Sequence, residues 1–145
     1  MRTSELLTRI ATAIKDSAPL NAWCIEHFHR APEVRIGLDP EKPPDRENYP
    51  VVTVFRMSHA RANNAHRQTW TVLLGVGVRG PGEAVLGNGV IVINGELLAE
   101  DLRELAEEAV FAARLGKVEP SSDVPDGVPL PFHLCWSTLQ IETIG

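Results

Sequence analysis

The sequence is short of cysteine and of positive charge, and each shortage narrows what the protein can be. Two cysteines, Cys24 and Cys135, stand far apart in a chain of 145 residues. They cannot build the disulfide framework of a small secreted domain, so we expect both thiols to be reduced. Lys and Arg number 14 against 19 Asp and Glu, giving a formal net charge of −5. Nucleic-acid binders usually carry a basic face, so specific nucleic-acid binding is not expected.

Long apolar segments are also missing. The longest apolar run, residues 72–78, contains two glycines and falls far short of the ~20 residues that a membrane-spanning helix needs. Residues 1–17 carry a charge every few positions, and no apolar stretch typical of a secretory signal follows them. We therefore expect a soluble protein that has no membrane partner and remains in the reducing compartment where it is made.

What is present is an ordinary globular composition, with 43% hydrophobic and 23% charged residues. A chain of this length buries roughly 68% of its unfolded surface on folding, which is enough for a core without covalent staples. We expect one domain that spans residues 1–145.

A helix is predicted near the start of the chain, ended by Pro19. Thr3 or Ser4 is suited to cap its first turn, because their hydroxyls can accept from free backbone N–H groups. Its apolar side chains recur at the spacing of one helical stripe. The stripe consists of Leu6, Leu7, Ile10 and Ile14.

The strongest helical pattern runs from Gly95 to about Leu115, with Asn94 as its N-cap and Gly116 at its C-terminal cap. One face is apolar, and we expect a row of glutamates to lie in water on the opposite face. The apolar stripe is Leu98, Leu102, Leu105, Ala109 and Ala112, and the acidic row is Glu96, Glu100, Glu104, Glu107 and Glu108.

Strands are predicted between and after these helices. The sequence RQTWTVLLGVGVR (residues 67–79) alternates strictly and should bury the face that carries Trp70 and Val72. The segment VVTVF (51–55) precedes it, and residues 57–66 are predicted to be the long loop of the hairpin between them.

The remaining strand predictions are shorter or less regular. Trp23–Phe28 and Val34–Leu38 have brief strand-like patterns, and VIVI (90–93) is either a short strand or leads directly into the helix. Phe132–Ile144 is the final strand, with a slip in alternation near Thr138 that predicts a bulge.

Two proline-rich segments, residues 39–50 and 119–131, are predicted loops, because proline removes backbone donors. Strands joined by turns form an antiparallel sheet, and two amphipathic helices must bury their stripes against it. The predicted fold is therefore a two-layer α+β domain.

Three motifs suggest chemistry, but each has a simpler interpretation. Residues 75–80 match G-x-G-x-x-G, yet the glycines lie inside a strand pattern and not at a turn before a helix, so no dinucleotide site is expected. Cys24, His27 and His29 fall short of a complete zinc ligand set, and we predict no metal there. A nucleophile elbow is absent, and the paired glutamates are explained by a solvated helix face. We predict that the protein is not an enzyme and needs no cofactor.

Charge is distributed unevenly along the chain. Basic residues gather around the predicted hairpin loop, and the acidic row lies on the second helix. A solvated surface explains both groups, but a head-to-tail contact between neighbouring subunits would pair them and close into a ring. The predicted interface residues are Arg56, Arg61, Arg67, Glu100, Glu104 and Glu107.

The order of these features resembles the tail-terminator (tail-completion) proteins of long-tailed bacteriophages, of the minor tail protein U type. The shared features are a leading amphipathic helix, a Pro/Asp-rich loop, the hairpin that ends in RQTWTVLLGVGVR, an Ala/Glu/Leu-rich helix and a last strand after a proline loop. The resemblance covers nearly the whole chain but is architectural, so it assigns no binding residues.

The resemblance implies a homo-oligomer, a hexameric ring that caps the tail tube and faces the connector of the head. The partners would be other copies of the chain, the tail tube protein and a head-completion protein, first in a bacterial cytoplasm and then in the virion tail. Two alternatives stay open. One is another head–tail joining or neck protein. The other is a small-molecule-binding domain or enzyme with a pocket near His133, Cys135 and Trp136.

Overall fold

The computed structural model describes residues 1–37, 44–62, 67–80, 83–93, 95–122 and 132–144. In chain order the elements are α1 (Thr3–Lys15), α2 (Ala18–Phe28), β1 (Glu33–Ile36), the 3-10 turn η1 (Arg46–Asn48), β2 (Val51–Arg61), β3 (Arg67–Arg79), β4 (Glu83–Val85), β5 (Ile91–Ile93), α3 (Glu96–Ala112), β6 (Lys117–Ser122) and β7 (Phe132–Ile144).

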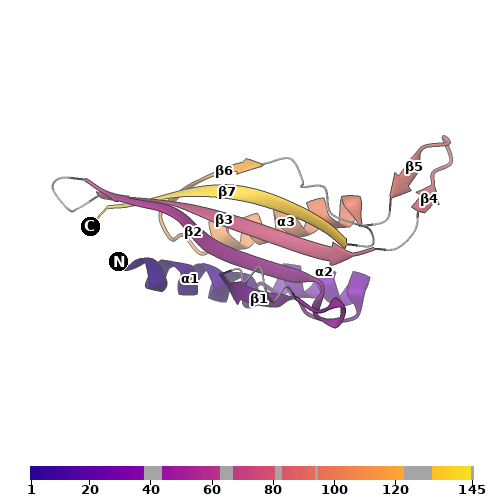
Figure 1. The fold of residues 1–145 in the computed structure, drawn as a ribbon, viewed down its shortest axis with the longest axis horizontal. Coiled ribbons are helices and arrows are strands. Elements are labelled where there is room, and N and C mark those ends of the chain that lie inside the picture. Colours follow the sequence, from indigo (N-terminus) through magenta and orange to yellow (C-terminus); the bar gives the residue numbers. More distant parts are fainter. Residues whose placement is uncertain (38–43, 63–66, 81–82, 94, 123–131, 145) are drawn as a thin grey trace.

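Five of the strands form one sheet in the order β1-β2-β3-β7-β6, whereas β4 and β5 pair only with each other (Figure 1). Every neighbouring pair in the sheet is antiparallel except β1 and β2, which are parallel. Helix α1 contacts β1 and β2, α3 contacts β3 and β7, and both α1 and α2 contact α3. The helices therefore form one layer against one face of the sheet, and the predicted α+β class is confirmed.

The core lies between these two layers. The alternation predicted for residues 67–79 is confirmed, since Trp70, Val72 and Leu74 on β3 are fully buried towards the helices. From α1, Leu6, Ile10 and Ile14 complete this core as the helical spacing indicates.

The prediction of a strand at Trp23–Phe28 is wrong, because these residues belong to helix α2. Pro19 lies in the first turn of this helix, where backbone N–H groups have no partner within the helix, so the missing N–H of proline costs no hydrogen bond. The Ser17 hydroxyl accepts a hydrogen bond from the Leu20 backbone N–H at 3.3 Å. A short apolar run does not show a helical or strand period. The helix is instead indicated by its N-terminal signals, the cap at Ser17 and the proline at Pro19.

Helix α3 is shorter than predicted, and the face that it buries is rotated about the helix axis from the predicted apolar stripe. Its buried residues are Ala99, Leu102, Arg103, Ala106, Ala109 and Val110. Of the predicted stripe, Leu98 and Leu105 are only half-buried and Ala112 is exposed. Beyond its last turn, Arg114 and not Gly116 takes the left-handed conformation of a helix end, with φ of 51°. The predicted cap Asn94 lies outside the described residues.

The strands also differ in detail from the prediction. The bulge lies in β2, between Arg56 and Ser58, whereas β7 pairs with β3 in unbroken register through Thr138. Strand β2 continues to Arg61, so residues 57–61 of the predicted hairpin loop are strand, whereas residues 63–66 lie outside the described part of the chain. Pro120 stands within the edge strand β6 and not in a loop, as an edge position allows.

Candidate subunit interface

The hairpin of β4 and β5, residues 83–93, projects from one end of the sheet, and we call it the arm (Figure 1). Gly89, with φ of 86°, allows the tight turn at its tip. The Leu86 backbone N–H donates to the Val90 carbonyl at 2.8 Å and closes the hairpin.

The arm is apolar, although it is exposed. Its large hydrophobic side chains are between 39% and 67% exposed, and they are Val85, Leu86, Val90, Ile91 and Ile93. Register pairs Val85 with Ile91 and Glu83 with Ile93, so one face of the arm presents Val85, Ile91 and Ile93 together with the carboxylate of Glu83. Exposed apolar patches of this kind mark interaction surfaces in folded proteins.

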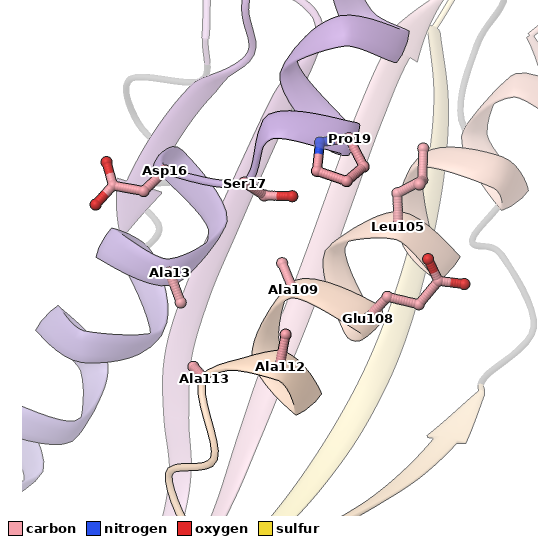
Figure 2. Close-up of a pocket in the computed structure, with 9 residues that line it drawn as sticks. All are labelled: Ala13, Asp16, Ser17, Pro19, Leu105, Glu108, Ala109, Ala112 and Ala113. Carbon is pink, nitrogen blue, oxygen red and sulfur yellow. The ribbon is translucent and has the colours of Figure 1, made fainter.

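A groove of about 490 Å³ lies between the end of α1, the start of α2 and the C-terminal half of α3, and we call it the interhelical groove. In Figure 2, Asp16 and Glu108 lie on opposite sides of it, with the small side chains of Ala13 and Ala109 between them. Its lining residues are Ala13, Asp16, Ser17, Pro19, Leu105, Glu108, Ala109, Ala112 and Ala113.

The residues predicted from charge lie in two separate regions. Arg56 and Arg61 are exposed on β2, and Arg67 on β3 is exposed while its Nε donates to the Glu142 carboxylate at 2.6 Å. Glu104 is exposed on α3. Pairing between copies of the chain at these positions stays a prediction.

Two acids of the predicted outer row instead bind within the subunit. The Arg103 guanidinium, buried between α3 and β7, donates to the Glu107 carboxylate at 2.8 Å and to the Glu100 carboxylate at 2.7 Å. The Ser137 hydroxyl on β7 also donates to Glu107, and Arg103 donates to that hydroxyl at 3.2 Å. The Glu107 side chain is only 12% exposed. Its placement on a wet outer face is therefore wrong, because Arg103 turns towards the sheet and draws it inwards.

Electrostatics inside this cluster follow from its contacts. The hydrogen bond from Arg103 is the main cause of a lowered pKa at Glu100. The Cys135 thiol donates to Glu100 at 3.1 Å, and burial, reinforced by that carboxylate, raises the thiol pKa to about 12. The only feature of the sequence that points to this cluster is an arginine in an otherwise acidic helix.

The Cys24, His27 and His29 motif does not converge. Cys24 points into the core, and burial raises its thiol pKa to about 12. The His27 ring packs against Trp23 at 4.6 Å between centroids, and His29 caps the end of α2 with φ of 61°. Within the described ranges, no three His, Cys, Asp or Glu side chains form a group that could hold a metal ion.

Gly75 and Gly77 of the G-x-G-x-x-G match lie on the sheet face opposite the helices. The indole of Trp136 covers Gly75, and Tyr49 and Leu134 cover Gly77. These residues line a small cavity of about 180 Å³. Cys135 is buried towards the helices, so Trp136 and Cys135 face opposite sides and cannot line one pocket. Nothing is described of the His133 side chain.

A second group of polar contacts, not predicted from the sequence, links α1 to the sheet. The Trp70 indole N–H donates to the Thr3 hydroxyl at 3.1 Å, and that hydroxyl is 3.3 Å from His59 Nδ1. The His59 ring stacks on Trp70 with 4.6 Å between centroids, and its Nε2 lies 2.9 Å from Gln68 Oε1. Thr3 is thus engaged by the sheet and not as the helix cap, since the N-cap residue is Arg2.

Comparison with known protein families finds no family model that matches the chain, and comparison with curated proteins finds no match. Among the helices of the described residues, none has both the length and the apolar character required to cross a bilayer.

Proposed function

We propose that this protein is a structural subunit of a bacteriophage or prophage tail, a tail terminator. Copies of the chain would assemble into a ring that caps the tail tube, stops its growth and joins it to the connector of the head. Assembly would take place in the bacterial cytoplasm, and the ring would remain in the virion tail.

The observation that carries the proposal is the apolar arm that projects from the body of the subunit. A two-stranded hairpin is marginally stable on its own in water, and this one exposes several branched aliphatic side chains. A surface of this kind is suited to contact between proteins, as expected for a subunit of an assembly. The α+β architecture and the order of its elements are in keeping with the same class.

The test uses purified protein with tail tube subunits that polymerise in solution. We expect the protein to limit tube length in proportion to its concentration, and electron microscopy to find a ring at one end of each tube. Light scattering of the protein alone and on tubes gives the mass of the ring.

The outcomes separate the candidate functions. Unchanged tube length together with binding to a head connector would favour a neck or head–tail joining protein. A protein that binds neither tubes nor connectors would reject a role in the tail. The alternative of a small-molecule-binding domain or enzyme has the Trp136 cavity as its site, and ligand-induced quenching of tryptophan fluorescence would favour it.

A further inference from the structure

We propose that Asn88, at the tip of the arm, is a site of spontaneous deamidation in the folded protein. Asn88 directly precedes Gly89, and the two residues belong to the turn that joins β4 to β5. The modification converts an exposed side-chain amide into a carboxylate. It is a property of the arm itself, so it does not depend on the proposed function or on what the arm contacts.

The reaction is an attack of the main chain on one of its own side chains. The backbone nitrogen of Gly89 loses its proton to hydroxide and bonds to Cγ of Asn88. The bond from Cγ to the side-chain nitrogen breaks, and ammonia leaves. A water molecule then opens the resulting five-membered imide at one of its two carbonyl carbons. One opening gives aspartate, and the other gives isoaspartate, in which the main chain runs through the side-chain carbon. Water is the only co-reactant.

The residue that supplies the nitrogen leaves the approach open. Gly89 has no side chain beside its nitrogen, and nothing lies within 4 Å of a Cβ built at this position. Its φ of 86° is one that residues with a side chain rarely adopt. Asn88 is itself exposed, so hydroxide and water reach both reacting atoms.

A backbone donor lies at the oxygen where negative charge develops. The Val90 N–H donates a hydrogen bond to Oδ1 of Asn88 at 3.1 Å, which is the Asx turn that asparagine forms with the backbone two residues on. This hydrogen bond polarises the carbonyl group that is attacked and stabilises the oxyanion of the tetrahedral intermediate. It also holds the side chain close to the main chain that follows it, where the Gly89 nitrogen lies.

One hydrogen bond of the turn opposes the reaction. The Gly89 N–H donates to the Leu86 carbonyl at 2.9 Å, and this bond must open before the nitrogen can react. Opening should cost little, because β4 and β5 pair only with each other and an isolated two-stranded hairpin is marginally stable in water. We therefore expect the folded arm to react nearly as fast as an unstructured chain.

Two other asparagines provide internal references. Asn21 lies within α2 and precedes Ala22, and its Nδ2 donates to the Lys15 carbonyl at 2.8 Å. Asn48 is the last residue of η1 and precedes Tyr49. In both places the next residue has a side chain beside its nitrogen, and the helical backbone is held by neighbouring turns. Both amides should outlast that of Asn88.

The test is incubation of the full-length protein at mildly alkaline pH, followed by digestion and mass spectrometry. Fragmentation of the peptides assigns each conversion to its position. We expect aspartate and isoaspartate at position 88, formed no more than about tenfold more slowly than in a synthetic peptide of residues 83–93. Asn21 and Asn48 should remain amides over the same time. An isoaspartyl methyltransferase, which labels only isoaspartate, should label the same position.

A pair of variants tests whether the open nitrogen of Gly89 controls the rate. Gly89→Asn keeps a residue type that tolerates a left-handed backbone but places a side chain beside the nitrogen, so conversion at position 88 should slow at least about tenfold. Gly87→Ala is the matched control on the other side of Asn88, where a new methyl group also meets nothing within 4 Å. It should leave the rate unchanged.

Three results would overturn the inference. The first is an intact amide at position 88 in the full-length protein after the synthetic peptide has converted. The second is conversion of Asn21 or Asn48 as fast as that of Asn88. The third is an unchanged rate in Gly89→Asn. Each of them concerns the turn alone and leaves the proposed role in the tail as it stands.

Discussion

The indole ring of Trp136 lies over Gly75, its register partner on the neighbouring strand, and occupies the space that a side chain would fill. Gly75→Ala would force the new methyl group against the ring. We expect a loss of about 1–3 kcal/mol in the free energy of unfolding, measured by urea denaturation.

The matched controls are a second glycine and a double variant. Nothing lies within 4 Å of a side chain built at Gly87, so Gly87→Ala should change the stability by less than about 0.5 kcal/mol. In a Trp136→Ala background, Gly75→Ala should lose most of its effect. Equal penalties in the two backgrounds would contradict the contact.

Removing Arg103 alone should destabilise the protein more than replacing Arg103 and its buried partners together by apolar residues. Arg103→Met leaves the carboxylate of Glu107 largely buried without its partner, so we expect a destabilisation of about 3–5 kcal/mol. Adding Glu107→Leu and Ser137→Ala should restore most of it, because apolar packing then replaces Arg103 and both of its buried partners, while the Glu100 side chain is 36% exposed and reaches water. Arg9→Met, which breaks an exposed ion pair with Glu5, should cost less than about 1 kcal/mol. Failure of the triple variant to recover stability would indicate a further role for Arg103.

Stability should fall in acid partly through Glu100. Its pKa is lowered in the folded protein from an ordinary value of 4.5. The charged form is therefore favoured on folding, and the stabilisation is complete above about pH 4.5 and is lost as the pH falls through the lower folded value. Glu100→Gln should flatten this part of the stability curve, whereas Glu104→Gln, at an exposed position, should leave it unchanged. A parallel shift of the whole curve would argue against the pairing.

Both native thiols should resist modification. Burial raises the pKa values of Cys24 and Cys135 to about 12, so little thiolate exists at pH 8. We expect a thiol reagent to label neither in the folded protein and both after unfolding. Because the folded-state pKa values exceed the ordinary value of 9.0, this contribution to stability is present below pH 9 and declines above it. Rapid labelling of Cys135 without unfolding would contradict its burial.

The charged regions offer a separate prediction for self-association. Arg61→Glu should weaken any assembly at low ionic strength if Arg61 faces acidic residues of α3 in a neighbour. The difference from the unchanged protein should shrink at high salt, because screening removes it. Sedimentation at two salt concentrations measures both effects, with Arg9→Glu as a charge-matched control. An identical oligomer size at low salt would exclude the contact.

The sequence predicted the secondary structure correctly where regularly spaced apolar residues are also the buried ones. The stripe of α1 and the alternation of β3 follow directly from apolar side chains at regular spacing, and they were sufficient for the two-layer class. Short segments failed, because Trp23–Phe28 carries no period of its own and its helical state depends on the cap at Ser17 and on packing of Cys24.

The candidate interface was harder to predict, because it depends on which side of an element faces inwards. Arginine is a residue type that usually lies on the surface. The burial of Arg103 is explained only by its contacts with Ser137 and two carboxylates. Ala109, which belongs to the predicted stripe, lines the interhelical groove. Of the arm, the sequence indicated only the VIVI segment (90–93) as a short strand or a lead into the helix, because the projection of the hairpin from the body depends on tertiary structure.

Pro120 in the outermost strand β6 has a consequence for behaviour at high concentration. Proline has no amide hydrogen, so that edge cannot offer an uninterrupted row of donors to another chain. Runaway strand addition of the kind that produces amyloid is thereby disfavoured at this side. At high protein concentration, copies of the chain are therefore less prone to join their sheets into fibrils through this edge.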